Sequence, residues 1–147
     1  MTNLYILFAA AAGAGVAAQA VINAQLRFVL GAPVWAAITQ FTVGLAALVV
    51  VAALSGRPLP AASALAQAPW WMWTGGLLGA TFILMAVIVT PTLGAALMLA
   101  ASIVGQLSAA LVIDHYGWFG AQVMAISPTR VVGVALLVVG VVLIRWN

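Results

Sequence analysis

Charged side chains are almost absent from this chain. Of its 147 residues only five are charged: Arg27, Arg57, Asp114, Arg130 and Arg145. A water-soluble domain needs about a quarter of its residues charged to face the solvent, so this composition excludes a soluble globule. The four arginines are spread along the sequence and form no basic patch, which excludes nucleic acid as a partner in spite of the net charge of +3.

Cysteine is absent too, which excludes disulfides, thiol catalysis and thiolate metal sites. One histidine and one acidic residue cannot form a metal site, and Ser102 lies about three helical turns from His115, the only histidine. The run from Gly13 to Ala18 matches a dinucleotide-binding fingerprint by letter, but it lacks a preceding strand and a following acidic residue. We therefore expect no enzyme activity, no metal and no cofactor.

Long apolar runs fill most of the sequence, and 67% of its residues are hydrophobic. In a bilayer every backbone amide must be paired within the protein, so spanning segments are helices or closed barrels. Barrel strands alternate polar and apolar residues, whereas these runs are continuous, which indicates helices. A span needs about 20 apolar residues, and five segments qualify. We predict an all-α integral membrane protein with a five-helix bundle in one domain, residues 1–147, with helices at about residues 4–26, 33–54, 70–90, 92–113 and 128–146.

Breakers and interfacial residues set the predicted boundaries. Arg27 ends the first span, a polar loop runs from Ser55 to Pro69, tryptophans open the third span, and Pro91 marks a short turn. The triplet from Ala18 to Ala20 has the form of a signal-peptide cleavage site, but a positively charged start is missing, so we expect the first span to be retained.

The start of the fifth helix has two interpretations. In the one we favour, the helix begins at Pro128, and Arg130 and Arg145 extend outward from its two ends. In the alternative, the helix begins near Ala121, kinks at Pro128 and carries Arg130 into the membrane. An arginine at a helix centre costs about 2.5 to 3.5 kcal/mol on insertion scales, which argues against the second version.

The arginines do not specify an orientation in the membrane. Five spans place the termini on opposite sides, with Arg57 and Arg130 on the N-terminal side and Arg27 and Arg145 on the other. Two against two is no positive-inside bias. We therefore predict that the chain inserts both ways round and pairs with an inverted copy of itself, reproducing the inverted repeats of larger transporters.

Uncharged polar residues recur at helical spacing inside the predicted spans. Gln19 and Asn23 share one helix face, Ser102 and Gln106 share another, and Gln40 lies on the second span. For each residue alone, hydrogen bonding between helices is a sufficient explanation. We interpret the carboxamides together as the lining of a shared cavity, and expect a solute to be bound by Gln19, Asn23, Gln40, Phe41, Ser102 and Gln106.

Two further groups complete the candidate residues. Asp114 and His115 end the fourth span, and with Arg130 we expect them near the membrane surface. A proton-coupled carrier normally needs an acid deep in the membrane, so we expect Asp114 to cap a loop or to pair with His115 or an arginine instead. Gly75 and Gly79 lie one helical turn apart and are expected to make a tight helix contact.

Several spaced motifs cover essentially the whole chain and carry a family resemblance: Gln19-Ala20-Val21-Ile22-Asn23, Gly31-x-Pro33, Phe41 to Gly44, Pro69-Trp70-Trp71 followed by Gly75-Gly76 and Gly79, Pro91-x-x-Gly94, Gly105-Gln106 and Asp114-His115-Tyr116-Gly117. Together they resemble the YdcZ-like group of small bacterial membrane proteins in the drug/metabolite transporter superfamily. The resemblance implies a five-helix half-transporter in the bacterial inner membrane that works as a dimer. Nothing here replaces the membrane-buried glutamate of the related small multidrug resistance proteins, so their drug-cation/proton antiport is not expected.

We therefore predict a dimeric transporter that moves a small neutral or zwitterionic metabolite by alternating access. The expected partners are the lipid bilayer, the solute, and an antiparallel identical chain or a paralogous five-helix chain. Two alternatives remain from the sequence. One is a non-transporting accessory or assembly subunit, and the other is a lipid flippase or scramblase in which Arg130 attracts the headgroup.

Overall fold

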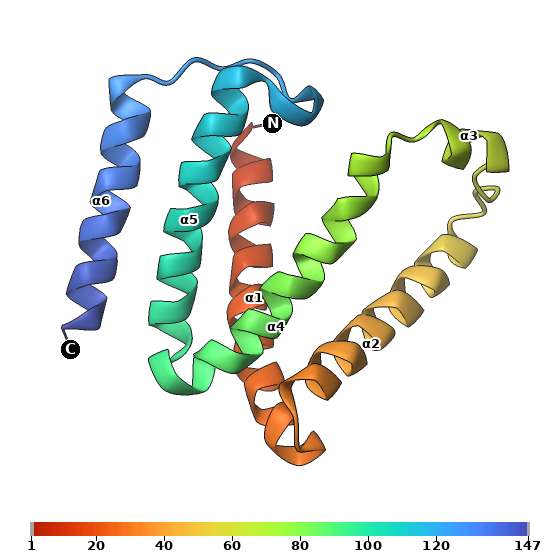
Figure 1. Ribbon diagram of the computed structural model, residues 1–147, viewed down its shortest axis with the longest axis horizontal. Coiled ribbons are helices and arrows are strands. Elements are labelled where there is room, and N and C mark those ends of the chain that lie inside the picture. The colour runs from red at the N-terminus through yellow and green to blue at the C-terminus, as the bar shows by residue number, and fades with distance from the viewer. Residues whose placement is uncertain (1, 147) are drawn as a thin grey trace. The chain divides into compact units, whose positions relative to one another are not determined.

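The computed structural model describes residues 2–146, and long helices account for most of them (Figure 1). The elements are α1 (Thr2–Leu30), α2 (Pro33–Leu54), α3 (Ala62–Gln67), the 3₁₀ turn η1 (Trp70–Trp73), α4 (Thr74–Leu93), α5 (Ala95–Tyr116), the 3₁₀ turn η2 (Trp118–Gly120) and α6 (Pro128–Arg145). The described residues contain no strand. Five helices, with η1 and α4 counted as one, are long and apolar enough to cross a membrane, which confirms the predicted fold class.

The chain divides into two compact units, Met1–Pro91 and Thr92–Asn147. We call them unit 1 and unit 2. Unit 1 contains α1, α2, α3 and nearly all of α4, and unit 2 contains α5 and α6. That the whole chain acts as one transmembrane domain stays a prediction.

In unit 1, α1 packs against α2, and buried alanines lie on both helices. The hairpin turn is made by Gly31, whose φ of 78° suits glycine, and Pro33 occupies the first turn of α2, where its missing N–H leaves no backbone acceptor unpaired. The buried alanines of the pair are Ala20 and Ala24 on α1 and Ala36 and Ala37 on α2. Small side chains let helix backbones approach closely in lipid, where dispersion contacts replace the hydrophobic effect as the source of packing energy.

Three predicted C-terminal helix ends were wrong by three or four residues, and the predicted start of the fourth helix at residue 92 was wrong by three, since α5 begins at Ala95. The first helix continues past Arg27 to Leu30, the third continues through Pro91 to Leu93, and the fourth includes Asp114 and ends at Tyr116. The predicted 55–69 loop also contains the short helix α3. In each of these helices the residue that was expected to end it lies within the last turns. Arg27 and Asp114 bond to groups outside their helices, and the Val87 carbonyl, which Pro91 leaves without a donor, accepts from Arg27.

Pro91 shows how a breaker is accommodated inside α4. Proline has no N–H, so the carbonyl of Val87, four residues earlier, loses its helical donor. The Arg27 guanidinium from α1 supplies the missing donor: its Nη1 lies 3.2 Å from the Val87 carbonyl oxygen and 3.2 Å from that of Ile88. Breakers are tolerated in membrane helices when neighbouring groups satisfy the freed backbone in this way.

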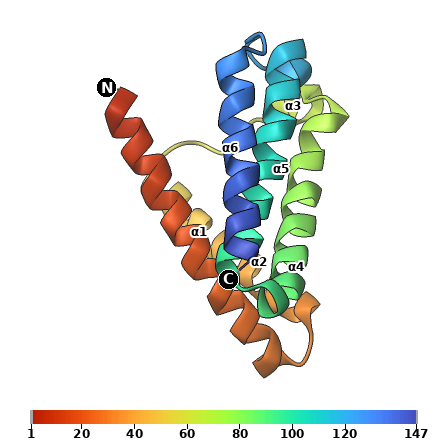
Figure 2. The same cartoon turned by 90° about the vertical axis from the view of Figure 1, so that its left-hand side faces the viewer.

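In unit 2, α5 and α6 lie side by side (Figure 2). The helix α6 begins at Pro128, and its preceding residue Ser127 accepts a hydrogen bond from the Arg130 N–H through its side chain. Residues 121–127 are not helical, so the alternative of a helix that starts near Ala121 and kinks at Pro128 is wrong. Arg130 accordingly lies in the first turn of α6.

The turn after α5 depends on glycine. Gly117 has a φ of 64°, and a Cβ at this position would lie 2.7 Å from Val123 Cγ2 and 3.3 Å from the Ala121 carbonyl oxygen. Gly120 has a similar φ of 78° but has open space around the same point. Left-handed backbone strains any other residue, whereas crowding is confined to Gly117.

Replacing Gly117 with alanine should therefore lower the free energy of unfolding by about 1–2 kcal/mol through strain and crowding. The measurement is thermal or detergent-induced unfolding of the purified protein. Gly120→Ala is the matched control, because it adds the strain without the crowding, and it should cost less. Equal losses in the two variants would mean that the Val123 contact does not matter.

Candidate functional site

Two of the expected solute-binding carboxamides bond to each other. The Asn23 side-chain nitrogen on α1 donates to the side-chain oxygen of Gln40 on α2. Asn23 is buried, with 6% of its surface exposed, and Gln40 is half-buried. For this pair the structure shows an interhelical hydrogen bond, which was the simpler interpretation of the two; the other was the lining of a solute cavity.

Gln19 lies one helical turn before Asn23 on the same face of α1. Its side chain is half-buried, and within residues 2–146 no hydrogen bond joins it to another group. An amide carries two donors and an acceptor, so an unpaired carboxamide at the depth of a membrane helix is available to a ligand. Among the expected solute-binding carboxamides of unit 1, Gln19 is therefore the one without a hydrogen bond in residues 2–146, and solute binding by it stays a prediction.

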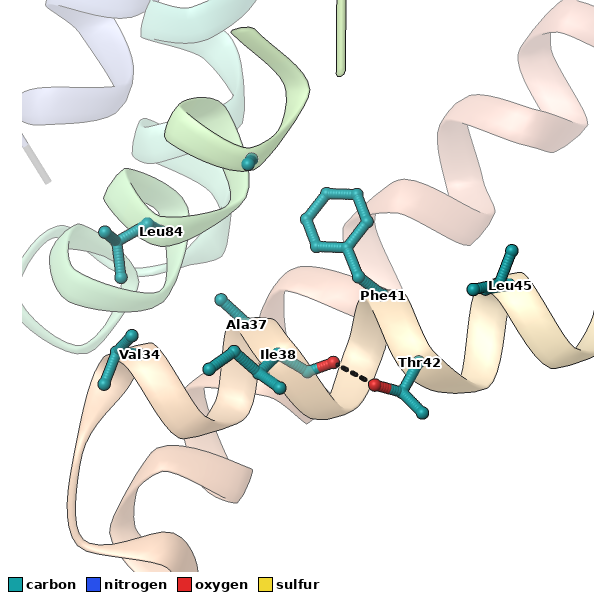
Figure 3. A pocket seen from close by; sticks show the side chains of 8 residues that line it. Val34, Ala37, Ile38, Phe41, Thr42, Leu45 and Leu84 are labelled. Carbon is teal, nitrogen blue, oxygen red and sulfur yellow. Dashed lines mark hydrogen bonds between the residues drawn. The ribbon is translucent and has the colours of Figure 1, made fainter. Parts of the chain in front are cut away.

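Phe41 lines a groove between α2 and α4 rather than the face that carries Gln40. The groove has a volume of about 360 Å³, and it is lined by Val34, Ala37, Ile38, Phe41, Thr42 and Leu45 of α2 and by Ala80 and Leu84 of α4. Figure 3 shows the Phe41 ring extending from α2 into the space beside α4. The Thr42 hydroxyl donates to the Ile38 carbonyl 2.9 Å away, so the walls offer almost no free polar group.

Ser102 and Gln106 lie on α5 in unit 2, whereas the other four residues lie on α1 and α2 in unit 1. The Ser102 hydroxyl donates to the Met98 carbonyl of its own helix, 2.8 Å away. The Gln106 side chain is exposed. A single cavity shared by all six residues therefore stays a prediction.

Arg27 is a candidate site residue that the sequence analysis missed, since it was interpreted there as a helix end and as one of the four arginines that bear on orientation. It continues the face of α1 that carries Gln19 and Asn23, at intervals of four residues. Its side chain is half-buried, and its Cζ lies 4.8 Å from the centre of the Phe28 ring. Two features of the sequence could have identified Arg27. It shares a helix face with Gln19 and Asn23, and Pro91 on a later span leaves a carbonyl without a donor.

Thr90 is a second polar residue without an expected role. Only 5% of its surface is exposed, and its hydroxyl has no hydrogen-bond partner among the described residues. Thr42, Thr81 and Ser102 each donate to the carbonyl four residues earlier. Thr90 does not make this local bond, although burying an unpaired hydroxyl costs about 1–3 kcal/mol.

Two charged residues of unit 2, Asp114 and Arg130, stabilise the α5–α6 turn. Arg130 and Asp114 form an ion pair of 2.5 Å between side chains that are 30% and 27% exposed. Arg130 also donates to the Met124 carbonyl, and the Ile126 N–H donates to His115 Nδ1. This is the arginine pairing that was one of the expected roles of Asp114. A small cavity of about 190 Å³ between α5 and α6 includes Arg130 in its wall.

Gly75 and Gly79 make no tight contact within the described part of the chain. A Cβ added at either glycine would meet nothing within 4 Å. A close helix contact at this position therefore stays a prediction.

Five apolar helices and only one acidic side chain define a multi-pass integral membrane protein. The family model described as "Putative inner membrane exporter, YdcZ" matches residues 4–143. The chain belongs to this YdcZ family, which confirms the resemblance seen in the sequence. The comparisons with curated proteins and with solved structures gave no match.

Proposed function

We propose that the chain is one half of a dimeric exporter that moves a small neutral or zwitterionic metabolite by alternating access. The observation that carries this proposal is the groove between α2 and α4, whose volume of about 360 Å³ falls in the range of small-molecule sites. The apolar part of a solute would pack against Phe41 in this groove. Its polar part would be bound by carboxamides, for which our candidates are the half-buried Gln19 of α1 and the exposed Gln106 of α5.

A partner chain would complete the transporter. Larger carriers place their site between two inverted repeats, and these 147 residues contain no second copy of any motif. The balanced arginines fit an antiparallel homodimer, and a paralogous five-helix chain would serve equally. The open space at Gly75 and Gly79 makes this part of α4 our candidate contact with that partner.

The main alternative is an accessory subunit that packs against a larger membrane protein and transports nothing. Water access separates the two functions, because an exporter must open its site to water on each side in turn. Since the chain contains no cysteine, single cysteines can report on this access without background labelling.

Cysteines introduced by Gln19→Cys and Phe41→Cys should react with a membrane-impermeant thiol reagent in intact vesicles. The control is Ala46→Cys, an exposed position on α2 that does not line the groove and that we expect to face lipid. Thiolate is the reactive form and is disfavoured in lipid, so labelling at Gln19 and Phe41 should be about tenfold faster or more than at Ala46. Equally slow labelling at all three positions would favour the accessory subunit.

The lipid flippase hypothesis relied on Arg130 as a headgroup partner. Asp114 already neutralises Arg130, and the Met124 carbonyl takes a further donor. An anionic headgroup would have to displace a carboxylate that is held in place by the same turn. We therefore do not extend the proposal to lipid transport through Arg130.

A further inference from the structure

Arg27 has no counterion among residues 2–146. The only acidic side chain in the sequence is Asp114, and it lies in unit 2, where it is paired with Arg130. Unit 1 therefore contains no carboxylate side chain that could neutralise Arg27. A half-buried charge that has lost part of its hydration is stabilised strongly by an opposite charge, and this chain supplies none nearby.

The hydrogen-bonding capacity of Arg27 is also only partly used. A guanidinium has five N–H donors in a planar fork. In the described residues Nη1 alone donates, and both of its acceptors are neutral carbonyls, those of Val87 and Ile88. The remaining donors match the paired oxygens of a carboxylate or phosphate, which an arginine binds in bidentate fashion.

Thr90 provides a second, independent indication on the neighbouring helix. It lies three residues after Val87, on the same face of α4, and its buried hydroxyl is unpaired. A hydroxyl donates well to an oxyanion. The unpaired Thr90 hydroxyl therefore lies on α4 and the Arg27 charge on α1, the two helices that the Arg27 hydrogen bonds connect.

We propose that Arg27 is an oxyanion-binding residue, which takes the carboxylate or phosphate group of a ligand. Where the ligand is the exported solute, this inference rests on the proposed function and changes its substrate class: the solute carries an acidic group, so it is zwitterionic or, outside the class proposed above, anionic, and it is not neutral. The same chemistry is present in the headgroup of an anionic lipid, which is the other source of the group.

Binding at Arg27 also affects α4. An oxyanion bound to the remaining donors draws the guanidinium away from the Val87 and Ile88 carbonyls, because charge-assisted bonds are stronger than those to neutral acceptors. The ligand would therefore loosen the bond between α1 and α4. Providing Val87 with its own donor should in turn free Arg27 for the ligand.

The test measures binding rather than transport. Purified protein in neutral detergent is titrated with sodium acetate and with inorganic phosphate, at ionic strength held constant with chloride, and the melting temperature is followed. A second arm compares nanodiscs of phosphatidylglycerol with nanodiscs of phosphatidylcholine. The wild type should be stabilised by the soluble anions, by phosphatidylglycerol, or by both, and Arg27→Gln should weaken the apparent affinity about tenfold or more.

Two further variants keep the test informative. Pro91→Ala restores the N–H that the Val87 carbonyl lacks, so it should tighten oxyanion binding severalfold. If Arg27→Gln does not fold, the double variant Arg27→Gln with Pro91→Ala keeps that carbonyl paired and should still fail to bind. Arg57→Gln removes an exposed arginine of the same unit and should change nothing.

Stabilisation by soluble anions identifies a solute group, and stabilisation by phosphatidylglycerol alone identifies a lipid headgroup; both support the inference if the effect depends on Arg27. No stabilisation in either arm, or equal stabilisation of Arg27→Gln, would overturn it. This test measures no transport, so its outcome is independent of the export proposal. If oxyanions bind at Arg27 but the cysteines at positions 19 and 41 stay unlabelled, the export proposal is wrong and the oxyanion site is still supported.

Discussion

Replacing Arg27 with methionine should lower the free energy of unfolding by about 2–3 kcal/mol, because hydrogen bonds from a charged group are lost and the Val87 carbonyl is left without a donor. The Pro91→Ala substitution should restore most of this loss in the double variant. Alanine at position 91 has the N–H that proline lacks, so the carbonyl regains its helical partner. The measurement is a double-mutant cycle by thermal or detergent-induced unfolding of the purified protein.

Arg57→Met is the control for this cycle, because Arg57 is exposed and follows the end of α2. Its loss should change stability by no more than about 0.5 kcal/mol. Additive effects of the Arg27 and Pro91 substitutions would contradict the account, since they would mean that the two residues act independently.

Replacing one residue of the Asn23–Gln40 pair should lower the free energy of unfolding more than replacing both. Asn23→Leu leaves the Gln40 carboxamide without its partner and should cost about 2 kcal/mol. Adding Gln40→Met replaces both amides with apolar groups of similar size, so the double variant should recover much of the stability. Unfolding of the three variants and the wild type measures the coupling between the two side chains.

Gln106→Met provides the comparison, because the exposed Gln106 has no hydrogen-bond partner among residues 2–146. Interhelical hydrogen bonds in membranes average about 0.6 kcal/mol, so a coupling near this value or above it is expected. If the double variant were as unstable as the sum of the singles, the carboxamides would not stabilise each other, and a direct role in solute binding would regain support.

The sequence was sufficient to locate all five spans, because continuous apolar runs have only one stable form in a bilayer. It was also sufficient for α2, whose start at Pro33 and end at Leu54 are set by local signals. The ends of α1 and α4 were not predictable in this way. Arg27 stays helical because a carbonyl on another helix accepts its bonds, and Pro91 stays helical because Arg27 donates them.

For the candidate site too, the sequence predicted what depends on local geometry and not what depends on packing between helices. Helical spacing correctly placed Gln19 and Asn23 on one face of α1, because this follows from geometry alone. Spacing could not show that Asn23 would pair with Gln40, or that Phe41 would point into a groove beside α4, because both depend on how neighbouring helices pack. The unpaired hydroxyl of Thr90 depends on its burial, which no local pattern encodes.

Efflux from reconstituted vesicles tests the central claim most directly. Liposomes containing the protein are loaded with a mixture of small zwitterionic, anionic, neutral and cationic metabolites, and the contents retained over time are compared by mass spectrometry with those of protein-free liposomes. We expect at least one small solute with an acidic group to leave faster from wild-type vesicles, and this difference to disappear with Gln19→Leu. Identical retention of every solute in wild-type and protein-free vesicles, with the protein folded and inserted, would contradict the assignment as an exporter.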